Sequence, residues 1–250
     1  VKYHESFNDA FVHYYGDVTA MLFPLSYGGR DLGVLAAAKK IADGGFSENE
    51  YELFRSASEQ AAFALGNATI HQEAGEKRKI EGELKTAQQV QKVLLPRRQP
   101  EITGYHIEGL NRPARLISGD YYDYINLGEG RWGVAIADVS GKGVAAGLLM
   151  AMCRSVLRAE LKRGADPLQA MSQLNRLMFN DIREDSFISM ALYVIDESNG
   201  NVQLVRAGHD KAPVYRHASG EVEWIKPPGL AIGLDDGDVF ERITKLHEFT

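Results

Sequence analysis

The sequence has one cysteine, no long basic run and no apolar stretch of membrane-spanning length. Cys153 cannot form an internal disulfide, which is typical of proteins from a reducing compartment. The lack of a basic run argues against a nucleic-acid interface, and the short apolar stretches argue against a membrane span. The N-terminus also lacks a signal-peptide pattern. We therefore expect a cytoplasmic protein that binds neither nucleic acid nor membrane.

The composition is that of a globular protein: 250 residues, 44% hydrophobic, 25% charged and a net charge of −6. This length suits one large domain or two modest ones. The first residue is Val1 instead of Met. We expect that the sequence begins and ends inside a longer protein.

The N-terminal region predicts a β-hairpin. Two apolar runs, 18–25 and 32–38, flank a turn at 27–31 that contains Gly28 and Gly29. The second run is almost entirely apolar, so we expect that strand to be buried on both faces.

A long helix is predicted after the hairpin, from Ser47 to Leu95. Ser47 and Glu50 form a capping-box pattern, and no proline interrupts the sequence until Pro96. At 1.5 Å per residue, a continuous helix would be about 70 Å long. Its second half, 69–95, has a weak heptad stripe made of Glu76, Ile80, Leu84, Ala87, Gln91 and Leu94.

Two interpretations of the segment 69–95 are open. It could be a solvated connector, or a two-stranded coiled coil that makes the protein a homodimer. A single polar helix of this length has little reason to stay folded alone, which favours the coiled coil. The heptad pattern is short and contains Gly75 and Gly82, so it does not decide the question.

The region from Pro96 to Thr250 predicts an α+β domain in which helices cover a largely antiparallel sheet. Helical periodicity marks 143–161 and 167–182, and Ser198-Asn199-Gly200-Asn201 is a hairpin turn. Strands are expected at 106–111, 132–138, 187–195, 202–207, 213–216 and 222–225.

Two acidic segments of this region are candidates for a cation site. Asp120 follows a Ser-Gly pair, and Asp138 ends an apolar strand before a glycine-rich turn. If the two strands are neighbours, these carboxylates converge, and hard cations prefer such oxygen ligands. Taken singly, Asp138 or Ser140 could instead be a helix cap, and Gly119-Asp120 a plain turn. The segment is not a Walker phosphate loop, because Ile136 and Gly143 occupy two of its required positions.

The order of seven short segments makes a more specific case. They are Leu94-Leu95-Pro96, Pro113-Ala114, Ser118-Gly119-Asp120-Tyr121-Tyr122-Asp123, Asp138-Val139-Ser140-Gly141-Lys142-Gly143, Ala145-Ala146-Gly147-Leu148-Leu149-Met150, Ala207-Gly208-His209 and Pro228-Gly229-Leu230-Ala231-Ile232-Gly233-Leu234. Together they resemble the metal-dependent protein phosphatase superfamily of the sporulation stage II E type, which includes regulators of bacterial sigma-factor switches. The resemblance covers about 94–250 and implies a layered α-β-β-α sandwich.

The resemblance also implies a mechanism with two Mn²⁺ or Mg²⁺ ions, in which an activated water hydrolyses phosphoserine or phosphothreonine. Asp138 would bridge both ions, the backbone carbonyl of Val139 would add a ligand, and Asp120 would hold one ion. Asp123 would support the ligands from outside. We assign no catalytic role to His209, because a lone histidine at a strand end is more often structural. Helices 143–161 and 167–182 match a pair whose movement could gate metal binding.

The sequence departs from the family pattern in one respect. The family has two further metal-binding aspartates in later segments, and neither occurs here. Either the phosphatase domain, 96–250, is cut short, or the protein is a naturally degenerate member of the family that has lost these ligands. In both cases a chain ending at Thr250 is expected to bind metal poorly and to be nearly inactive.

Residues 1–68 resemble the C-terminal part of a GAF sensor domain. The matching residues are Met21 to Leu25, Leu32 to Ala37, Phe46-Ser47-Glu48 and Gln60 to Ala68. The sensor's ligand or upstream regulator stays unknown, because much of the implied pocket would precede Val1.

These observations favour a regulated phosphoprotein phosphatase, controlled by a sensor through a dimeric helix. The resemblance implies a phosphorylated anti-sigma-factor antagonist as substrate. The alternative is a catalytically incomplete, phosphatase-like module that binds a partner, and a plain dimeric scaffold ranks last. Further metal-binding aspartates in the native sequence would favour the enzyme over the binding module.

Overall fold

The computed structural model describes residues 18–113, 116–183 and 185–250. Ala114 of the Pro113-Ala114 motif and the first 17 residues of the expected sensor domain lie outside the described residues. The chain divides into two compact units, Val1–Glu81 and Gly82–Thr250, and each is described by itself.

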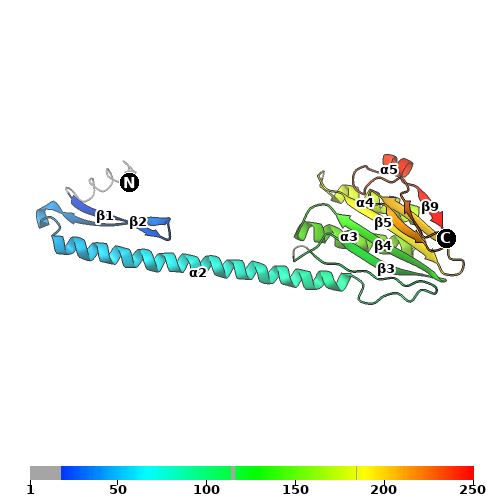
Figure 1. Cartoon of the computed structure of the whole chain (residues 1–250). Helices are drawn as coiled ribbons and strands as arrows, with labels where there is room; N and C mark the ends of the chain where they lie inside the picture. The colour runs from blue at the N-terminus through cyan, green and yellow to red at the C-terminus, as the bar shows by residue number, and fades with distance from the viewer. Residues whose placement is uncertain (1–17, 114–115, 184) are drawn as a thin grey trace. The chain divides into compact units, whose positions relative to one another are not determined.

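The first unit contains a β-hairpin and the first part of a long helix (Figure 1). Strands β1 (Val18–Tyr27) and β2 (Arg30–Lys40) pair antiparallel, and the 3-10 turn η1 (Ile41–Asp43) follows. Gly28 and Gly29 connect the strands with φ of 58° and 78°, which suits a tight hairpin turn. The predicted hairpin is therefore confirmed.

Helix α2 (Glu48–Leu94) is continuous over 47 residues. The predicted capping box is present at its start. The Ser47 amide donates to Glu50 Oε2 over 2.7 Å, and the Glu50 amide donates to Ser47 Oγ over 3.3 Å. These bonds satisfy amides that the first turn of a helix leaves without partners.

One face of the hairpin packs on α2 around Tyr27. The Tyr27 ring meets Phe63 edge to face at 5.6 Å, and its hydroxyl donates to Asn67 Oδ1 over 3.2 Å. A Cβ at Gly66 would overlap the Tyr27 ring. Gly66 therefore lets the end of β1 approach the helix closely.

The expectation that the second strand is buried on both faces is wrong. No residue of β2 is buried, and Val34 is 52% exposed. Three cross-strand pairs share the open face: Ala20 with Ala38, Leu22 with Ala36, and Pro24 with Val34. An apolar strand is buried on both faces only where other elements cover both faces of its sheet. Within the described residues of this unit, α2 covers one face of the hairpin.

The second unit is built on a five-stranded antiparallel sheet in the order β3-β4-β5-β6-β9 (Figure 1). Helix α3 packs on β3 and β4, and helix α4 packs on β5 and β6. The strands are β3 (Tyr121–Gly128), β4 (Arg131–Val139), β5 (Ile188–Asp196), β6 (Val202–Ala207) and β9 (Leu246–Phe249). The helices are α3 (Val144–Lys162), α4 (Pro167–Asp181) and α5 (Asp238–Ile243). The predicted antiparallel sheet and helix pair are confirmed.

The main core lies between the sheet and the helices α3 and α4. Met150, Cys153 and Leu157 recur every three or four residues on α3 and are fully or almost fully buried. Burial raises the pKa of the Cys153 thiol to about 12, so this cysteine is an inert core residue.

The opposite face of the sheet carries a partial second layer. Strands β7 (Ala212–Arg216) and β8 (Glu221–Ile225) form a separate hairpin. The hairpin packs Val214 and Ile225 in a cluster with Leu204 of β6. The described residues thus show a helical layer, a sheet and part of a second β layer. They show no second helical layer of the expected sandwich.

Segment 106–111 was expected to be a strand, and this is wrong. It crosses the open face of the sheet, where Ile107 packs in a cluster with Trp132 and Val134. No neighbouring strand in the described ranges offers it a hydrogen-bonded ladder. The first strand of the sheet is instead β3, which begins directly after the Ser-Gly-Asp motif.

None of the helices within 18–113, 116–183 and 185–250 is long and apolar enough to cross a membrane.

We expect Gly229→Ala to destabilise the second unit severely. A Cβ at Gly229 would overlap the carbonyl oxygen of Arg206, and the Gly229 carbonyl accepts a bond from the Gly208 amide. Rigid backbone surrounds the site, so the loss should reach or exceed about 3 kcal/mol. Urea unfolding followed by circular dichroism measures it.

Gly82→Ala is the matched control. Gly82 lies in α2 with open space around it, so this change should stabilise the helix by about 0.5–1 kcal/mol. Equal stability of the two variants would show that the backbone at Gly229 can move aside.

Candidate functional site

The structure brings Asp120 and Asp138 together at one end of the sheet. Tyr121 pairs with Ala137 across β3 and β4, which places the residue before Tyr121 beside the residue after Ala137. Partial burial and the nearby charge of Asp120 raise the pKa of Asp138. The two carboxylates therefore form a like-charge pair that favours a proton or a cation between them.

The segment before Asp120 is tightly held. Ser118 Oγ donates to Asp120 Oδ2 over 3.2 Å and accepts from the Asp120 amide over 3.1 Å. The carbonyl oxygen of Val139 lies 2.8 Å from the position that a Cβ on Gly119 would occupy. Only glycine fits there, so Val139 and the Asp120 segment lie in direct backbone contact.

The glycine-rich turn after Asp138 connects β4 to α3. The Ser140 amide donates to the Phe187 carbonyl over 2.9 Å, and the Phe187 amide donates to Ser140 Oγ over 2.8 Å. Gly143, with a φ of 78°, precedes the helix and provides no side-chain cap. Ser140 thus joins the turn to the start of β5, and neither Asp138 nor Ser140 caps α3.

His209, to which we assigned no catalytic role from the sequence, lies at the same end of the sheet. Its Nδ1 lies 2.9 Å from Ser189 Oγ, and Ser189 pairs with Asp138 across β4 and β5. Burial lowers the pKa of His209 against the opposing effects of Asp210 and Asp138, so the imidazole is neutral at pH 7. The sequence feature that could have identified His209 is its position directly after the buried strand β6 and Gly208.

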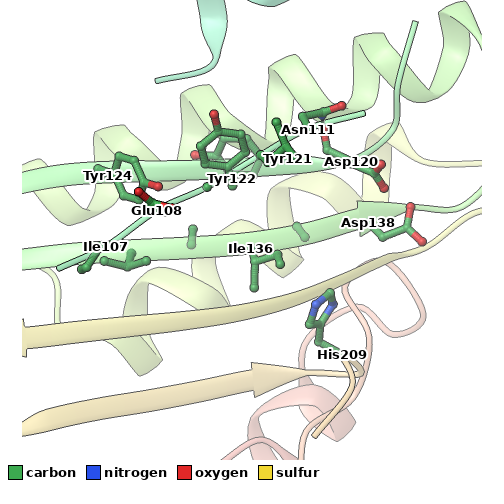
Figure 2. A pocket seen from close by; sticks show the side chains of 15 residues that line it. Ile107, Glu108, Asn111, Asp120, Tyr121, Tyr122, Tyr124, Ile136, Asp138 and His209 are labelled. Atoms are coloured by element: carbon green, nitrogen blue, oxygen red, sulfur yellow. Dashed lines mark hydrogen bonds between the residues drawn. The ribbon is translucent and has the colours of Figure 1, made fainter. Parts of the chain in front are cut away.

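A cavity of about 490 Å³ extends from these residues along the open face of β3 and β4. Figure 2 shows Asp120, Asp138 and His209 toward one end, and Ile107 and Tyr124 toward the other. The rings of Tyr122 and Tyr124 line one side of the cavity, and their centroids are 5.8 Å apart.

Two buried polar atoms at this cavity have no hydrogen-bond partner among the described residues. They are the Tyr124 hydroxyl and Asn111 Oδ1, whereas Asn111 Nδ2 donates to the Asp120 carbonyl over 3.1 Å. Buried polar groups are normally paired, so the cavity has unused capacity for a polar ligand, for water or for a further segment of protein.

Asp123 does not take part in this arrangement. Its fully buried carboxylate accepts from Arg158 Nε over 2.6 Å and Nη2 over 2.7 Å, and from the Tyr121 hydroxyl over 2.8 Å. Arg154 lies 3.8 Å away. Asp123 therefore ties β3 to α3 on the helix side of the sheet, and it bonds to neither Asp120 nor Asp138 in the described contacts.

The candidate ligands at this site are of the kinds that a hard divalent cation prefers, but there are few of them. Two carboxylates and a nearby backbone carbonyl are oxygen ligands of the kind that Mg²⁺ and Mn²⁺ accept, with water in the other positions. In the part of the chain that the structure describes, no three His, Cys, Asp or Glu side chains are grouped to hold an ion. The described residues are therefore too few for a complete two-ion centre.

Comparison with known proteins agrees with this picture. Residues 128–247 match the family model of stage II sporulation protein E, SpoIIE. The phosphoserine phosphatase RsbU of Bacillus subtilis is 29% identical over 160 residues, which cover 64% of this chain and 48% of RsbU. The phosphoserine phosphatase RsbP of the same organism is 27% identical over 157 residues, which cover 61% of this chain and 38% of RsbP. The chain therefore spans about half or less of the length of these relatives.

Among solved structures, the SiaA-PP2C domain of Pseudomonas aeruginosa matches with a TM-score of 0.54 and 16% identity. The match covers 70% of this chain and 68% of that domain. At this identity the likeness shows the fold alone. Together, the family model and the relatives support a SpoIIE-type phosphatase domain in the C-terminal part of the chain.

We expect Asp123→Asn to destabilise the protein by about 3 kcal/mol, because it removes the fully buried carboxylate that pairs with the partly buried Arg158. The exposed pair of Arg176 and Glu241, 2.7 Å apart, provides the control. Glu241→Gln should cost less than about 1 kcal/mol. Chemical denaturation of both variants measures the difference, and a similar small loss in each would show that the Asp123 pair contributes little.

Asp138→Asn should stabilise the metal-free protein at pH 7. The pKa of Asp138 is raised in the folded state, so its ionisation costs folding free energy above the ordinary carboxylate range, and this cost disappears as pH falls below about 3.9. Solvent screening limits the gain to about 1 kcal/mol, or roughly 2–4 °C in Tm.

Calorimetry in EDTA between pH 7 and pH 4 tests this expectation, with the exposed Asp236→Asn as control. The advantage of Asp138→Asn should shrink toward pH 4. A lower Tm than that of the parent at pH 7 would contradict the like-charge pair.

Proposed function

We propose that the second unit is the core of a phosphoprotein phosphatase domain, about 96–250, that acts on phosphoserine or phosphothreonine. The observation that carries the proposal is the convergence of Asp120 and Asp138 at the end of an open cavity. Similarity to two phosphoserine phosphatases and to the SpoIIE family supports it.

In this proposal Asp138 would be shared between two Mn²⁺ or Mg²⁺ ions, Asp120 would hold one of them, and the Val139 carbonyl would add a ligand. Bound ions of this kind supply an activated water as nucleophile and neutralise phosphate oxygens. The protein fixes the ligands through the β3–β4 register and the contact between Gly119 and Val139. His209 borders the cavity as a neutral imidazole and adds no positive charge that would compete with the ions.

Two ions need more ligands than Asp120, Asp138 and Val139 supply. We propose that residues outside the 250 provide them, and that the domain is completed there. The open face with its unpaired polar atoms supports this, because it has room for further chain.

Control of the phosphatase would come from the N-terminal region. We propose a GAF-like sensor at 1–68 with an unidentified ligand, and a linker at 69–95 that pairs with a second copy as a coiled coil. The continuity of α2 supports a mechanical link. Gln91 of the predicted heptad stripe is buried within the second unit, so helix pairing would be confined to earlier turns.

A phosphorylated anti-sigma-factor antagonist is the proposed substrate, and the cytoplasm the proposed location. The substrate rests on the resemblance to regulators of sigma-factor switches, and the location on the lack of disulfides. The second candidate function is a phosphatase-like module that binds a partner without catalysis. The small ligand set among the described residues favours that candidate.

The deciding experiment measures Mn²⁺-dependent phosphate release from a phosphoserine protein. We expect the 250-residue chain to be nearly inactive and a chain extended to the native C-terminus to be active. Asp138→Asn in the extended chain should reduce the rate by more than about 100-fold, since loss of supporting residues alone costs about 10–100-fold.

Asp236→Asn makes the same change at an exposed residue, and it should leave the rate unchanged. If the extended parent is inactive with every metal and phosphoprotein tried, the partner-binding module is the better interpretation.

A further inference from the structure

The ring of His209 lines the cavity beside Asp138, and a residue of β5 holds it there (Figure 2). Its Nδ1 lies 2.9 Å from Ser189 Oγ. Ser189 is directly opposite Asp138 across β4 and β5, and such pairs point their side chains to the same face of a sheet. Ser189 therefore fixes the imidazole on the face of the sheet that carries Asp138.

The backbone around His209 is fixed as well. The Gly208 amide, at a φ of 66°, donates to the Gly229 carbonyl over 3.1 Å. Arg206 donates from Nη1 to the His209 carbonyl, and from Nε to the Pro227 carbonyl over 2.8 Å. These bonds tie the end of β6 to a second segment of the chain, so the ring has little freedom to leave the cavity.

One of the two ring nitrogens of His209 stays available for a ligand. Its Nε2 makes no hydrogen bond to a described residue and is open to the cavity that the ring lines. Burial lowers the pKa of His209, so the ring is neutral at pH 7 and has a single N–H. The Ser189 hydroxyl can donate to Nδ1, and the ring proton is then on Nε2. In that tautomer His209 offers one fixed donor to the cavity.

A donor at this position suits an oxygen of a phosphate group. Mn²⁺ and Mg²⁺ prefer oxygen ligands, and a nitrogen that carries a proton cannot bind a cation. Both bonds that Arg206 makes in the described chain go to neutral carbonyl oxygens, so its positive charge remains to attract an anion. Fixed donors in a partly enclosed site are effective at stabilising charged oxygens.

We propose that His209 is a catalytic residue that donates a hydrogen bond from Nε2 to the phosphate of the phosphoserine or phosphothreonine substrate. Ser189 is the positioning residue that sets the required tautomer. This inference rests on the proposed phosphatase function and adds a substrate contact to it. The ring proton is shared in a hydrogen bond and is not transferred, so His209 orients the phosphate and stabilises its charge.

The first test needs neither metal nor turnover. Nitrogen NMR of the imidazole in the 250-residue chain reports which ring nitrogen carries the proton. We expect the proton on Nε2 at pH 7, and Ser189→Ala should populate the other tautomer as well. A parent with its proton on Nδ1 would overturn the inference, because Nε2 could then only accept. An unchanged tautomer in Ser189→Ala would overturn the role of Ser189.

The second test compares His209→Asn with His209→Gln in the extended chain with Mn²⁺. The amide of glutamine reaches about as far as Nε2, whereas that of asparagine reaches only about as far as Nδ1. We expect His209→Asn to lower kcat/KM by about 10–100-fold and to raise the inhibition constant of inorganic phosphate, since one bond to a charged group is lost. His209→Gln should lose less in both. His217→Asn, at an exposed histidine, should match the parent.

The outcomes separate failure of this inference from failure of the proposed function. If the extended parent is active and His209→Asn matches it, the inference is wrong and the proposed function stands. An equal loss in both His209 variants, with Tm lowered equally, would show that His209 only stabilises the fold. A parent that is inactive with every metal and phosphoprotein tried would overturn the proposed function and this inference together.

Discussion

The antiparallel register of β3 and β4 is the constraint on which the site depends. Tyr121 faces Ala137 in this register, and the adjacent Asp120 and Asp138 meet at the strand ends. Side chains alternate between the faces of a strand, so a slip of one residue would turn Asp138 toward the helices and Ala137 toward the cavity. The paired hydrogen bonds between Asp123 and the partly buried Arg158 oppose such a slip, because they anchor the other face of β3 to α3. Asp123, which was expected to support the ligands from outside, thus lies on the helix side of the sheet and bonds to neither Asp120 nor Asp138 in the described contacts.

The sequence predicted the two acidic segments and their convergence, because a strand followed by a glycine-rich turn places Asp138 at a sheet edge. It did not predict β3 as a strand, since Gly119-Asp120 has the composition of a turn and the strand begins one residue later. The role of Asp123 could not be predicted either. Its partner Arg158 is 35 residues away, and local pattern does not report pairs at that separation.

The remaining differences have a common physical cause. The second strand of the hairpin and segment 106–111 both have compositions that suit strands, yet one is exposed and the other unpaired. Propensity describes how a residue fits a half-buried sheet, and the neighbouring layers decide whether that sheet exists. His209 was overlooked for a related reason: its significance comes from Ser189 and Asp138 on other strands, and single-residue statistics carry no such information.

Two adjacent carboxylates repel each other and destabilise a folded protein that holds no cation between them. The raised pKa of Asp138 reflects this repulsion, and the backbone nearby has little freedom to relieve it. Gly119 is pressed against Val139, Ser118 is bonded to Gln91, and α3 packs against both segments. A site that keeps like charges together must be held by its surroundings, so its geometry is sensitive to those surroundings. Here they include the last turns of α2, because Gln91 bonds to the Ser118 backbone beside Asp120.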